Sequence, residues 1–229
     1  MDEALRRHYL AAMSIDVWEQ RHQRTSPASS VPDRDNEGAR VDRGVAILDW
    51  PELKREVESC RRCPLHASRT QTVFGSGNPR ASWMFVGEAP GAEEDRQGEP
   101  FVGRAGQLLN AMLFAMGLTR DEVYIANVLK CRPPSNRDPA DPEVCACEPF
   151  LGRQIALVQP RLIVAMGRFA AHSLLKTDTP LARLRGQKLQ YGDCPLVVTY
   201  HPAYLLRNPV DKRKVWHDLM LARSIVADP

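Results

Sequence analysis

The chain has 229 residues, of which 43% are hydrophobic and 26% are charged, and its formal net charge is +3. These values are ordinary for a globular protein and exclude a wholly disordered chain, a coiled-coil rod and a collagen-like fibre. No apolar run approaches the ~18 residues of a membrane span, the N-terminus lacks the pattern of a secretory signal, and the charge permits nucleic-acid binding without arguing for it. We therefore expect a cytoplasmic protein with no membrane contact and reduced cysteines.

The N-terminal part of the chain divides into an arm and a linker. Apolar residues at helical spacing predict a helix within residues 1–24. Residues 25–45 contain prolines and many small polar residues but no aromatic residue, so they bury too little apolar surface to offset the entropy of ordering. We expect a helical arm over 1–24, a flexible linker over 25–45 and a folded domain over 46–229. The arm either docks on that domain or binds a partner.

Helical patterns and short apolar runs alternate through the rest of the chain. The helical patterns cover residues 48–60, 104–117, 141–158, 167–176 and 210–226. The apolar runs, each of about strand length, cover residues 82–87, 123–128, 161–167 and 195–200. This alternation predicts βαβ units around a buried parallel sheet. Ligands bind such sheets beyond the C-terminal ends of the strands, and the loops that follow these runs carry the unusual residues of the chain, so we expect the site there.

The cysteines predict a metal centre. Cys60 and Cys63 form a C-x-x-C pair, and Cys131 lies in a loop rich in proline. Four thiolates suffice for a zinc ion or a [4Fe–4S] cluster, and spacing alone chooses neither the metal nor the fourth ligand between Cys145 and Cys147. A structural role is expected, with a redox role as the rival interpretation.

Three motifs occur in a fixed order along the chain. They are GEAPGAEEDRQGEPFVGRAGQLL over 87–109, NVLKCRPPSNRDP over 127–139 and HPAYLLR over 201–207. Together with the cysteines they resemble family 4 uracil-DNA glycosylases, which are bacterial and archaeal base-excision repair enzymes with an iron–sulfur cluster. The resemblance runs from about residue 50 to residue 227.

This resemblance implies a fold, a cofactor and an activity. The fold is a three-layer α/β/α sandwich around a four-stranded parallel sheet. The cofactor is a [4Fe–4S] cluster, and the ligands implied are Cys60, Cys63, Cys131 and Cys147. The activity is hydrolysis of the N-glycosidic bond of deoxyuridine in single- or double-stranded DNA, which releases uracil and leaves an abasic site. We expect the enzyme to be a monomer.

The chemistry of uracil excision assigns roles to residues of the motifs. A flipped base needs a stacking platform, a partner for its edge and a donor for the anion that develops on it. Phe101 is the expected platform, and the amide of Asn127 complements the N3–H and O4 edge of uracil. His201 is expected to donate a hydrogen bond to uracil O2, and Gly87 lets the backbone approach the base. Without the motifs these would be a packed aromatic, a capping asparagine and a structural histidine.

The carboxylates of the first motif are harder to assign. By resemblance, Glu88 lies at the water-positioning end, and Glu94 lies near the base, where it excludes the thymine methyl group or assists catalysis. Family 1 enzymes have an aspartate where this chain has Ala89. Glu93 and Asp95 are interpreted as a solvated acidic turn.

The residues after His201 are expected to contact DNA. Either Leu205 or Leu206 fills the gap left by the flipped base, and Arg207 binds a phosphate. Further phosphate contacts are expected from Arg104, Lys130, Arg132 and Arg137. The segment 95–101 lacks the inserted basic loop and histidine of related enzymes that attach covalently to the abasic product, so turnover is expected.

A second hypothesis concerns the arm. RRHYLAAMSIDVW, over residues 6–18, faintly resembles the N-terminal arm of the psi subunit of bacterial DNA polymerase III. It implies a replication-associated interaction protein whose residues 1–24 contact the clamp loader, with or without the glycosylase activity.

Overall fold

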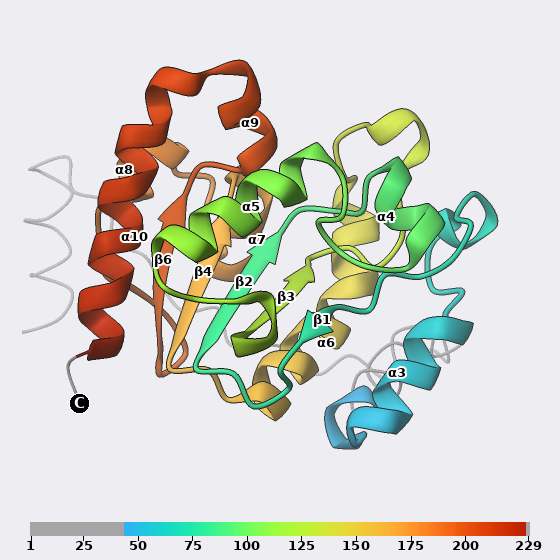
Figure 1. The fold of residues 1–229 in the computed structure, drawn as a ribbon. Coiled ribbons are helices and arrows are strands. Elements are labelled where there is room, and N and C mark those ends of the chain that lie inside the picture. Colours follow the sequence, from blue (N-terminus) through green and yellow to red (C-terminus); the bar gives the residue numbers. More distant parts are fainter. Residues whose placement is uncertain (1–43, 228–229) are drawn as a thin grey trace, which may run out of the picture. The chain divides into compact units, whose positions relative to one another are not determined.

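The computed structural model describes residues 44–227, and Figure 1 shows their arrangement. The predicted arm over 1–24 and nearly all of the predicted linker over 25–45 lie outside the described residues. Their boundaries stay predictions.

A mixed sheet forms the centre of the described part (Figure 1), with strand order β1-β3-β2-β4-β6-β5. Its four central strands are parallel and correspond to the four predicted runs: β2 (Trp83–Gly87), β3 (Val123–Asn127), β4 (Leu162–Met166) and β6 (Cys194–Thr199). Two short strands extend it antiparallel at the edges, β1 (Ser76–Gly77) and β5 (Leu189–Tyr191). Sequence analysis did not predict these edges, because two or three half-exposed residues carry no periodic pattern.

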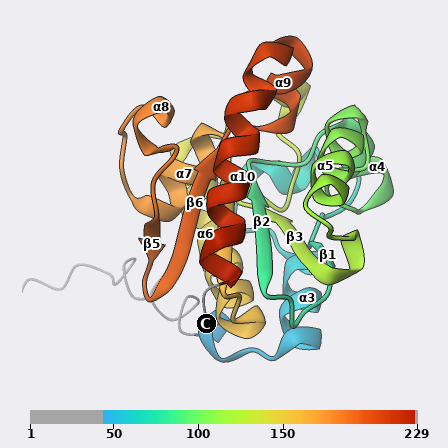
Figure 2. The ribbon, with the colours of Figure 1, turned by 60° about the vertical axis from the view of Figure 1, so that its left-hand side comes forward.

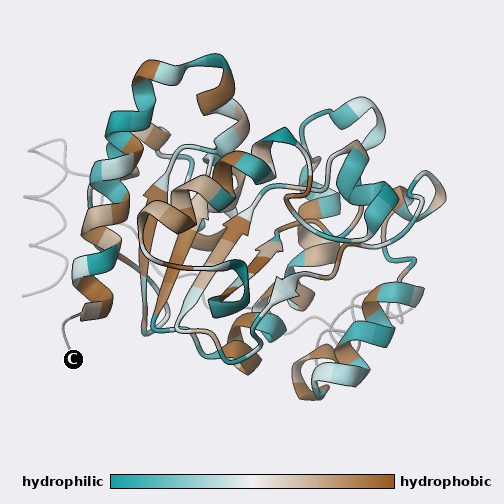
Figure 3. Ribbon diagram, in the orientation of Figure 1, coloured by the Kyte–Doolittle hydropathy of each residue, from teal (hydrophilic) through white to brown (hydrophobic). Residues whose placement is uncertain are grey.

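Helices cover both faces of the sheet, as Figures 1 and 2 show. Met84 and Val86 of β2 pack with α6 (Asp141–Val158) and α7 (Arg168–Leu175) on one face. The alternate residues Trp83 and Phe85 pack with α5 (Arg104–Ala115) and α10 (Lys212–Ala227) on the other. The central strands are hydrophobic along their length (Figure 3), and their alternate residues pack on opposite faces. This is typical of a buried parallel sheet, and the three-layer α/β/α prediction is confirmed.

A third apolar cluster lies beside the sheet and contains the cysteine segments. Leu53 and Val57 of α3 (Trp50–Ser59) pack there against Leu129 and Phe150. The helix begins in a reciprocal cap, because the Glu52 N–H donates to Asp49 Oδ1 at 2.8 Å and the Asp49 N–H donates to Glu52 Oε2 at 3.0 Å.

The predicted loops contain short helices that periodicity did not reveal. They are α4 (Ala92–Gln97), α8 (Leu181–Leu184), α9 (Pro202–Arg207) and the 3₁₀ turns η1 (Pro64–Ala67), η2 (Arg120–Glu122), η3 (Pro134–Asn136) and η4 (Pro209–Asp211). One or two turns are too short for a helical repeat to be recognised. None of the helices between residues 44 and 227 has the length and apolarity needed to cross a membrane.

Candidate active site

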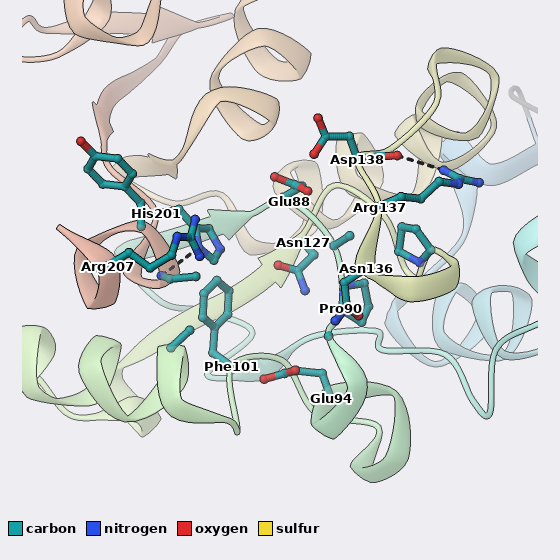
Figure 4. Close-up of a pocket in the computed structure, with 16 residues that line it drawn as sticks. Glu88, Pro90, Glu94, Phe101, Asn127, Asn136, Arg137, Asp138, His201 and Arg207 are labelled. Carbon is teal, nitrogen blue, oxygen red and sulfur yellow. Dashed lines mark hydrogen bonds between the residues drawn. The ribbon is translucent and has the colours of Figure 1, made fainter.

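A cavity of about 440 Å³ opens where β2, β3 and β6 end, which is the predicted edge of the sheet (Figure 4). It brings together residues from all three motifs. Its lining comprises Glu88, Ala89, Pro90, Gly91, Glu94, Phe101, Ala105, Asn127, Pro133, Asn136, Arg137, Asp138, His201, Ala203, Tyr204 and Arg207.

Asn127 is the last residue of β3 and is only 2% exposed. Its Oδ1 is buried and has no hydrogen-bond partner within the described part of the chain. Gly87 lies opposite it in the register of β2 and β3, and a Cβ at Gly87 would come within 2.4 Å of that oxygen. A buried acceptor without a partner costs about 1–3 kcal/mol, so its presence in a cavity points to a ligand that brings a donor.

Phe101 is held rigidly beside Asn127. Its backbone has a φ of 56°, which is unusual for a bulky residue. Arg120 stabilises this conformation by donating from Nη1 to the Phe101 carbonyl at 3.1 Å and from Nη2 to the Pro100 carbonyl at 2.5 Å. A Cβ at Gly106 would lie 1.7 Å from the Phe101 carbonyl oxygen, so only glycine fits there. The ring is thereby fixed at the cavity, 5.4 Å from that of His201 and inclined by 32°.

His201 caps the N-terminus of α9. Its Nδ1 accepts the N–H of Ala203 at 3.1 Å, which assigns the proton of the neutral ring to Nε2. The pKa of His201 is lowered to about 4, mainly by burial and in part by the Arg207 charge, while Glu94 opposes the shift. The ring is therefore a neutral donor at physiological pH, and Figure 4 shows it beside Phe101 and Asn127.

Glu88 follows β2 and lies at the opposite side of the cavity, facing Asp138 (Figure 4). The pKa of Glu88 is raised to about 7, mainly by burial and in part by the Asp138 carboxylate, while Arg168 opposes the shift. Arg168 also pairs with Asp138, at 3.1 Å between Nη2 and Oδ2. A carboxyl group with a pKa near neutrality is suited to accept a proton in the working range of a cell.

Glu94 lies in the cavity wall but holds the backbone. Its Oε1 accepts the N–H groups of Val102 at 2.9 Å and Gly103 at 3.0 Å, at the start of α5. This position suits a negative charge near a helix N-terminus, and it anchors the loop that carries Phe101. The predicted role of Glu94 toward the base stays a prediction.

The interpretation of the acidic turn is wrong for one residue. Glu93 is exposed and pairs with Arg96 at 2.5 Å, as expected of a solvated side chain. Asp95 is only 4% exposed, and both its carboxylate oxygens accept the N–H of Thr70, at 3.0 and 3.1 Å. It stabilises the loop before β1. The two residues are 25 positions apart, so the local sequence does not predict this contact.

The structure also separates the predicted DNA contacts. Leu205 is 1% exposed and packs in the core, so it cannot insert into DNA, whereas Leu206 is 38% exposed. Arg207 is exposed at the cavity, and Arg137 lines it while pairing with Glu143. Lys130 is 1% exposed, so its predicted phosphate contact is wrong.

The four predicted ligand cysteines meet in a second, smaller pocket. Cys60, Cys63, Cys131 and Cys147 line it together with Arg69 and Lys130. Cys145 is exposed and outside it, and Cys194 donates to the Pro160 carbonyl at 3.2 Å elsewhere. The folded chain thus separates Cys147 from Cys145, which spacing could not do.

Two donors point at sulfur atoms of this pocket. Arg69 donates from Nη1 to the Cys131 Sγ at 3.0 Å, and the Lys130 N–H donates to the Cys147 Sγ at 3.2 Å. Burial raises the pKa of the Cys147 thiol to about 12 while Lys130 lowers it. Within residues 44–227, no three His, Cys, Asp or Glu side chains converge closely enough to coordinate a single ion.

Several residues around the cavity were not singled out by sequence analysis. Arg120, Asp138 and Arg168 act on Phe101 and Glu88 through contacts between distant segments. Asp138 lies within the second motif, but its residue type alone does not indicate a role. Arg120 and Arg168 lie in no motif, so no sequence signal indicates their roles.

Comparison with known proteins agrees with this geometry. The family model of the uracil DNA glycosylase superfamily matches residues 74–220, and the chain belongs to that superfamily. Within it, the chain is a member of the type-4 uracil-DNA glycosylases, as its curated relatives indicate.

Three of the relatives that carry this name illustrate the similarity. The one from Archaeoglobus fulgidus is 46% identical over 69% of this chain and 83% of its own length. The one from Thermotoga maritima is 43% identical over 76% of this chain and 93% of its own length. The one from Sulfurisphaera tokodaii is 42% identical over 78% of this chain and 85% of its own length.

Proposed function

We propose that the protein is a DNA repair glycosylase that hydrolyses the N-glycosidic bond of deoxyuridine, releasing uracil and leaving an abasic site. The observation that carries this proposal is the unpartnered Oδ1 of Asn127 in one cavity with the Phe101 ring and the neutral His201. The relatives named as type-4 uracil-DNA glycosylases support the same substrate.

Base recognition follows from the amide of Asn127. Uracil N3–H donates to Asn127 Oδ1, and the Asn127 side-chain N–H donates to uracil O4. Cytosine has an acceptor at N3 and a donor at C4, so both bonds would be mismatched and the buried oxygen would stay unpaired. The Phe101 ring stacks on the base, which must leave the DNA stack to reach it.

Bond cleavage then proceeds by heterolysis. The bond between C1′ of the sugar and N1 of uracil breaks, and its electron pair goes to the base. The Nε2–H of His201 donates to uracil O2 and stabilises the negative charge there. A water oxygen bonds to C1′, Glu88 accepts the water proton, and the uracil anion is protonated from solvent.

The role proposed for Glu88 predicts a pH profile. Because burial raises its pKa to about 7, the fraction of ionised carboxylate and hence kcat/KM should rise with pH and level off above about 8. Asp138→Asn should move the midpoint to lower pH, and Arg168→Met should move it to higher pH. Glu88→Gln should lower the plateau roughly 10²-fold. Single-turnover rates from pH 5 to 9 measure this, with Glu93→Gln as the control. If the midpoint is the same in Asp138→Asn and Arg168→Met as in the unaltered enzyme, the role of Glu88 as proton acceptor is contradicted.

On the DNA side, we assign the wedge to Leu206 and phosphate contacts to Arg207 and Arg137. Leu206 is the exposed member of the leucine pair and follows the cavity residues on α9. Arg207 and Arg137 line the cavity and are exposed, so their guanidinium groups can reach the phosphates that flank a flipped nucleotide.

The two leucines form a matched pair for testing the wedge. Leu205→Ala should lower the free energy of unfolding by about 2–5 kcal/mol, since it empties a core position. Leu206→Ala should leave stability within about 0.5 kcal/mol and slow uracil release from double-stranded DNA more than from single strands, because only the duplex leaves a gap to fill. Denaturant unfolding and the duplex-to-single-strand rate ratio measure this; an unchanged ratio in Leu206→Ala removes the wedge.

We propose that the cysteine pocket holds a [4Fe–4S] cluster. A cluster binds each of four thiolates to a different iron, and the four cysteines line one pocket. The N–H groups of Arg69 and Lys130 suit negatively charged sulfur. When bound, such a group joins three distant segments of the chain, and we propose that its role is structural.

Cys145 provides a control for the cluster two positions from Cys147. Cys147→Ser should abolish bound iron and the broad absorbance near ~400 nm, and lower the melting temperature by about 5 °C or more. Cys145→Ser should change none of these, since its side chain is exposed and outside the pocket. Iron analysis and spectra of protein purified without oxygen test both; equal iron in the two variants contradicts the ligand set.

We further propose that the enzyme works as a monomer in the cytoplasm on single- or double-stranded DNA. The alternative, an interaction protein that contacts the clamp loader through residues 1–24, gains no support from the comparisons, and that arm lies outside the described residues.

The proposed activity has a direct test. The protein is incubated with an oligonucleotide that contains one deoxyuridine, and alkali then cleaves any abasic site. Strand cleavage at that position is expected with uracil and not with thymine. No cleavage of either single- or double-stranded substrate would overturn the proposal.

A further inference from the structure

A buried lysine lies between the cavity and the cysteine pocket. Lys130 comes three residues after Asn127 and one before Cys131, and it is 1% exposed. Its Nζ donates to the Asn127 carbonyl at 2.8 Å and to Gln154 Oε1 at 2.6 Å. No carboxylate within residues 44–227 forms an ion pair with it.

Lys130 contacts both sites. Its side chain lines the cysteine pocket, and its N–H donates to the Cys147 Sγ. Its ammonium is bonded to the carbonyl of Asn127, the residue that faces the base. The positive charge therefore lies behind the base-recognition residue, on the side toward the sulfur atoms.

A buried ammonium without a carboxylate partner is expensive to keep, since the desolvation cost is several kcal/mol. A methionine would fill the same volume without that cost. Packing alone therefore does not explain why a charged residue occupies this position.

The proposed reaction supplies one. Negative charge develops on uracil as the bond breaks, and a cysteine-ligated cluster adds negative charge on the other side of Lys130. Two negative charges near each other in a low-dielectric interior would raise the barrier, and a cation between them lowers it.

We infer that Lys130 is a positioning residue. Its ammonium holds the Asn127 carbonyl by a hydrogen bond, and the buried positive charge of this group stabilises the departing uracil anion against the negative charge of the cysteine site. This inference rests on the proposed function. It predicts that the loss of Lys130 lowers the rate most for a base whose own substituents do least to stabilise its negative charge.

The test compares two leaving groups. Fluorine at C5 stabilises the base anion by itself, so 5-fluorouracil depends less on the protein's charge. Lys130→Met should lower kcat for uracil about 10²-fold, lower kcat for 5-fluorouracil by no more than about 10-fold, and leave KM within about threefold. Lys130→Arg should restore most of the uracil rate. The surface variant Lys176→Met is the control.

A second variant keeps the lysine and removes its net charge. Gln154→Glu places a carboxylate on Nζ with almost no change in shape. The Tyr124 hydroxyl, now 3.0 Å from Gln154 Nε2, can donate to it, while the hydrogen bond from Nε2 to the Phe74 carbonyl, at 2.9 Å, is lost. It should reproduce the leaving-group dependence even where Lys130→Met fails to fold. Iron content and the melting temperature are measured in every variant.

A readout independent of turnover is the N1–H pKa of uracil bound with abasic DNA, followed by NMR of ¹⁵N-labelled uracil. It should be higher in Lys130→Met and Gln154→Glu than in the unaltered enzyme. Equal losses on both leaving groups, or an unchanged pKa of bound uracil, would overturn the inference and leave the glycosylase proposal standing. Failure of the unaltered enzyme to release uracil would instead overturn the proposed function.

Discussion

Asn127→Ala is expected to slow uracil release roughly 10²–10³-fold while leaving the fold intact. The variant removes both proposed hydrogen bonds to the base edge. The free energy of unfolding should stay the same or rise by about 1 kcal/mol, because the substitution removes a buried acceptor that has no partner. Single-turnover rates and denaturant unfolding measure the two effects.

A gain in stability combined with a loss of activity would show that Asn127 serves to bind the base and not to stabilise the fold. Asn78→Ala is the matched control, since Asn78 is exposed and its Oδ1 accepts the N–H of Arg80 at 2.9 Å. It should affect neither measurement. Uracil release by Asn127→Ala within about threefold of the unaltered rate would show that the base is recognised elsewhere.

His201→Ala is the second large effect, also roughly 10²–10³-fold, because it removes the donor to the oxygen where charge develops. The substitution should act on kcat more than on KM, since the bond strengthens only as the base becomes an anion. His217→Ala, an exposed position on α10, is the control. Equal effects of the two histidine variants would contradict the assignment.

His201 also predicts how stability depends on pH. Its pKa is about 4 in the folded protein, below its ordinary value near 6.5, so the unfolded chain binds the proton more tightly. The unaltered protein should therefore lose stability as pH falls from about 6.5 toward 4, by at most a few kcal/mol. His201→Ala should lose less over that range. NMR titration of the ring should find it neutral at pH 6; a ring that is half protonated there would contradict the neutral-donor role.

The sequence predicted the core of the fold because burial leaves a repeating signal. The apolar runs over 82–87 and 123–128 became β2 and β3, and the patterns over 104–117 and 141–158 became α5 and α6. The edge strands and α4, α8 and α9 were missed, since two or three strand residues, or one or two helical turns, are too few for a repeat to be recognised.

The candidate site was predictable where the residue type alone indicates the chemical role. An amide and a histidine at the ends of two strands and an aromatic ring in the loop before α5 could be named from motifs, and the structure brings Asn127, His201 and Phe101 to one cavity. Which side chains surround them could not be named. Arg120 reaches the Phe101 carbonyl from 19 positions away, and Arg168 acts on Glu88 from 80 positions away.

The sequence by itself determined the alternation of strands and helices, the cavity residues at the strand ends, and the candidate cysteines. Only the tertiary structure decided that Leu205 is buried and Leu206 exposed, that Asp95 is structural, and that Lys130 lies behind Asn127. The physical reason is that exposure, pairing and pKa depend on which distant segments pack together. Neighbouring residues of one type are indistinguishable until that packing turns one inward and the other outward.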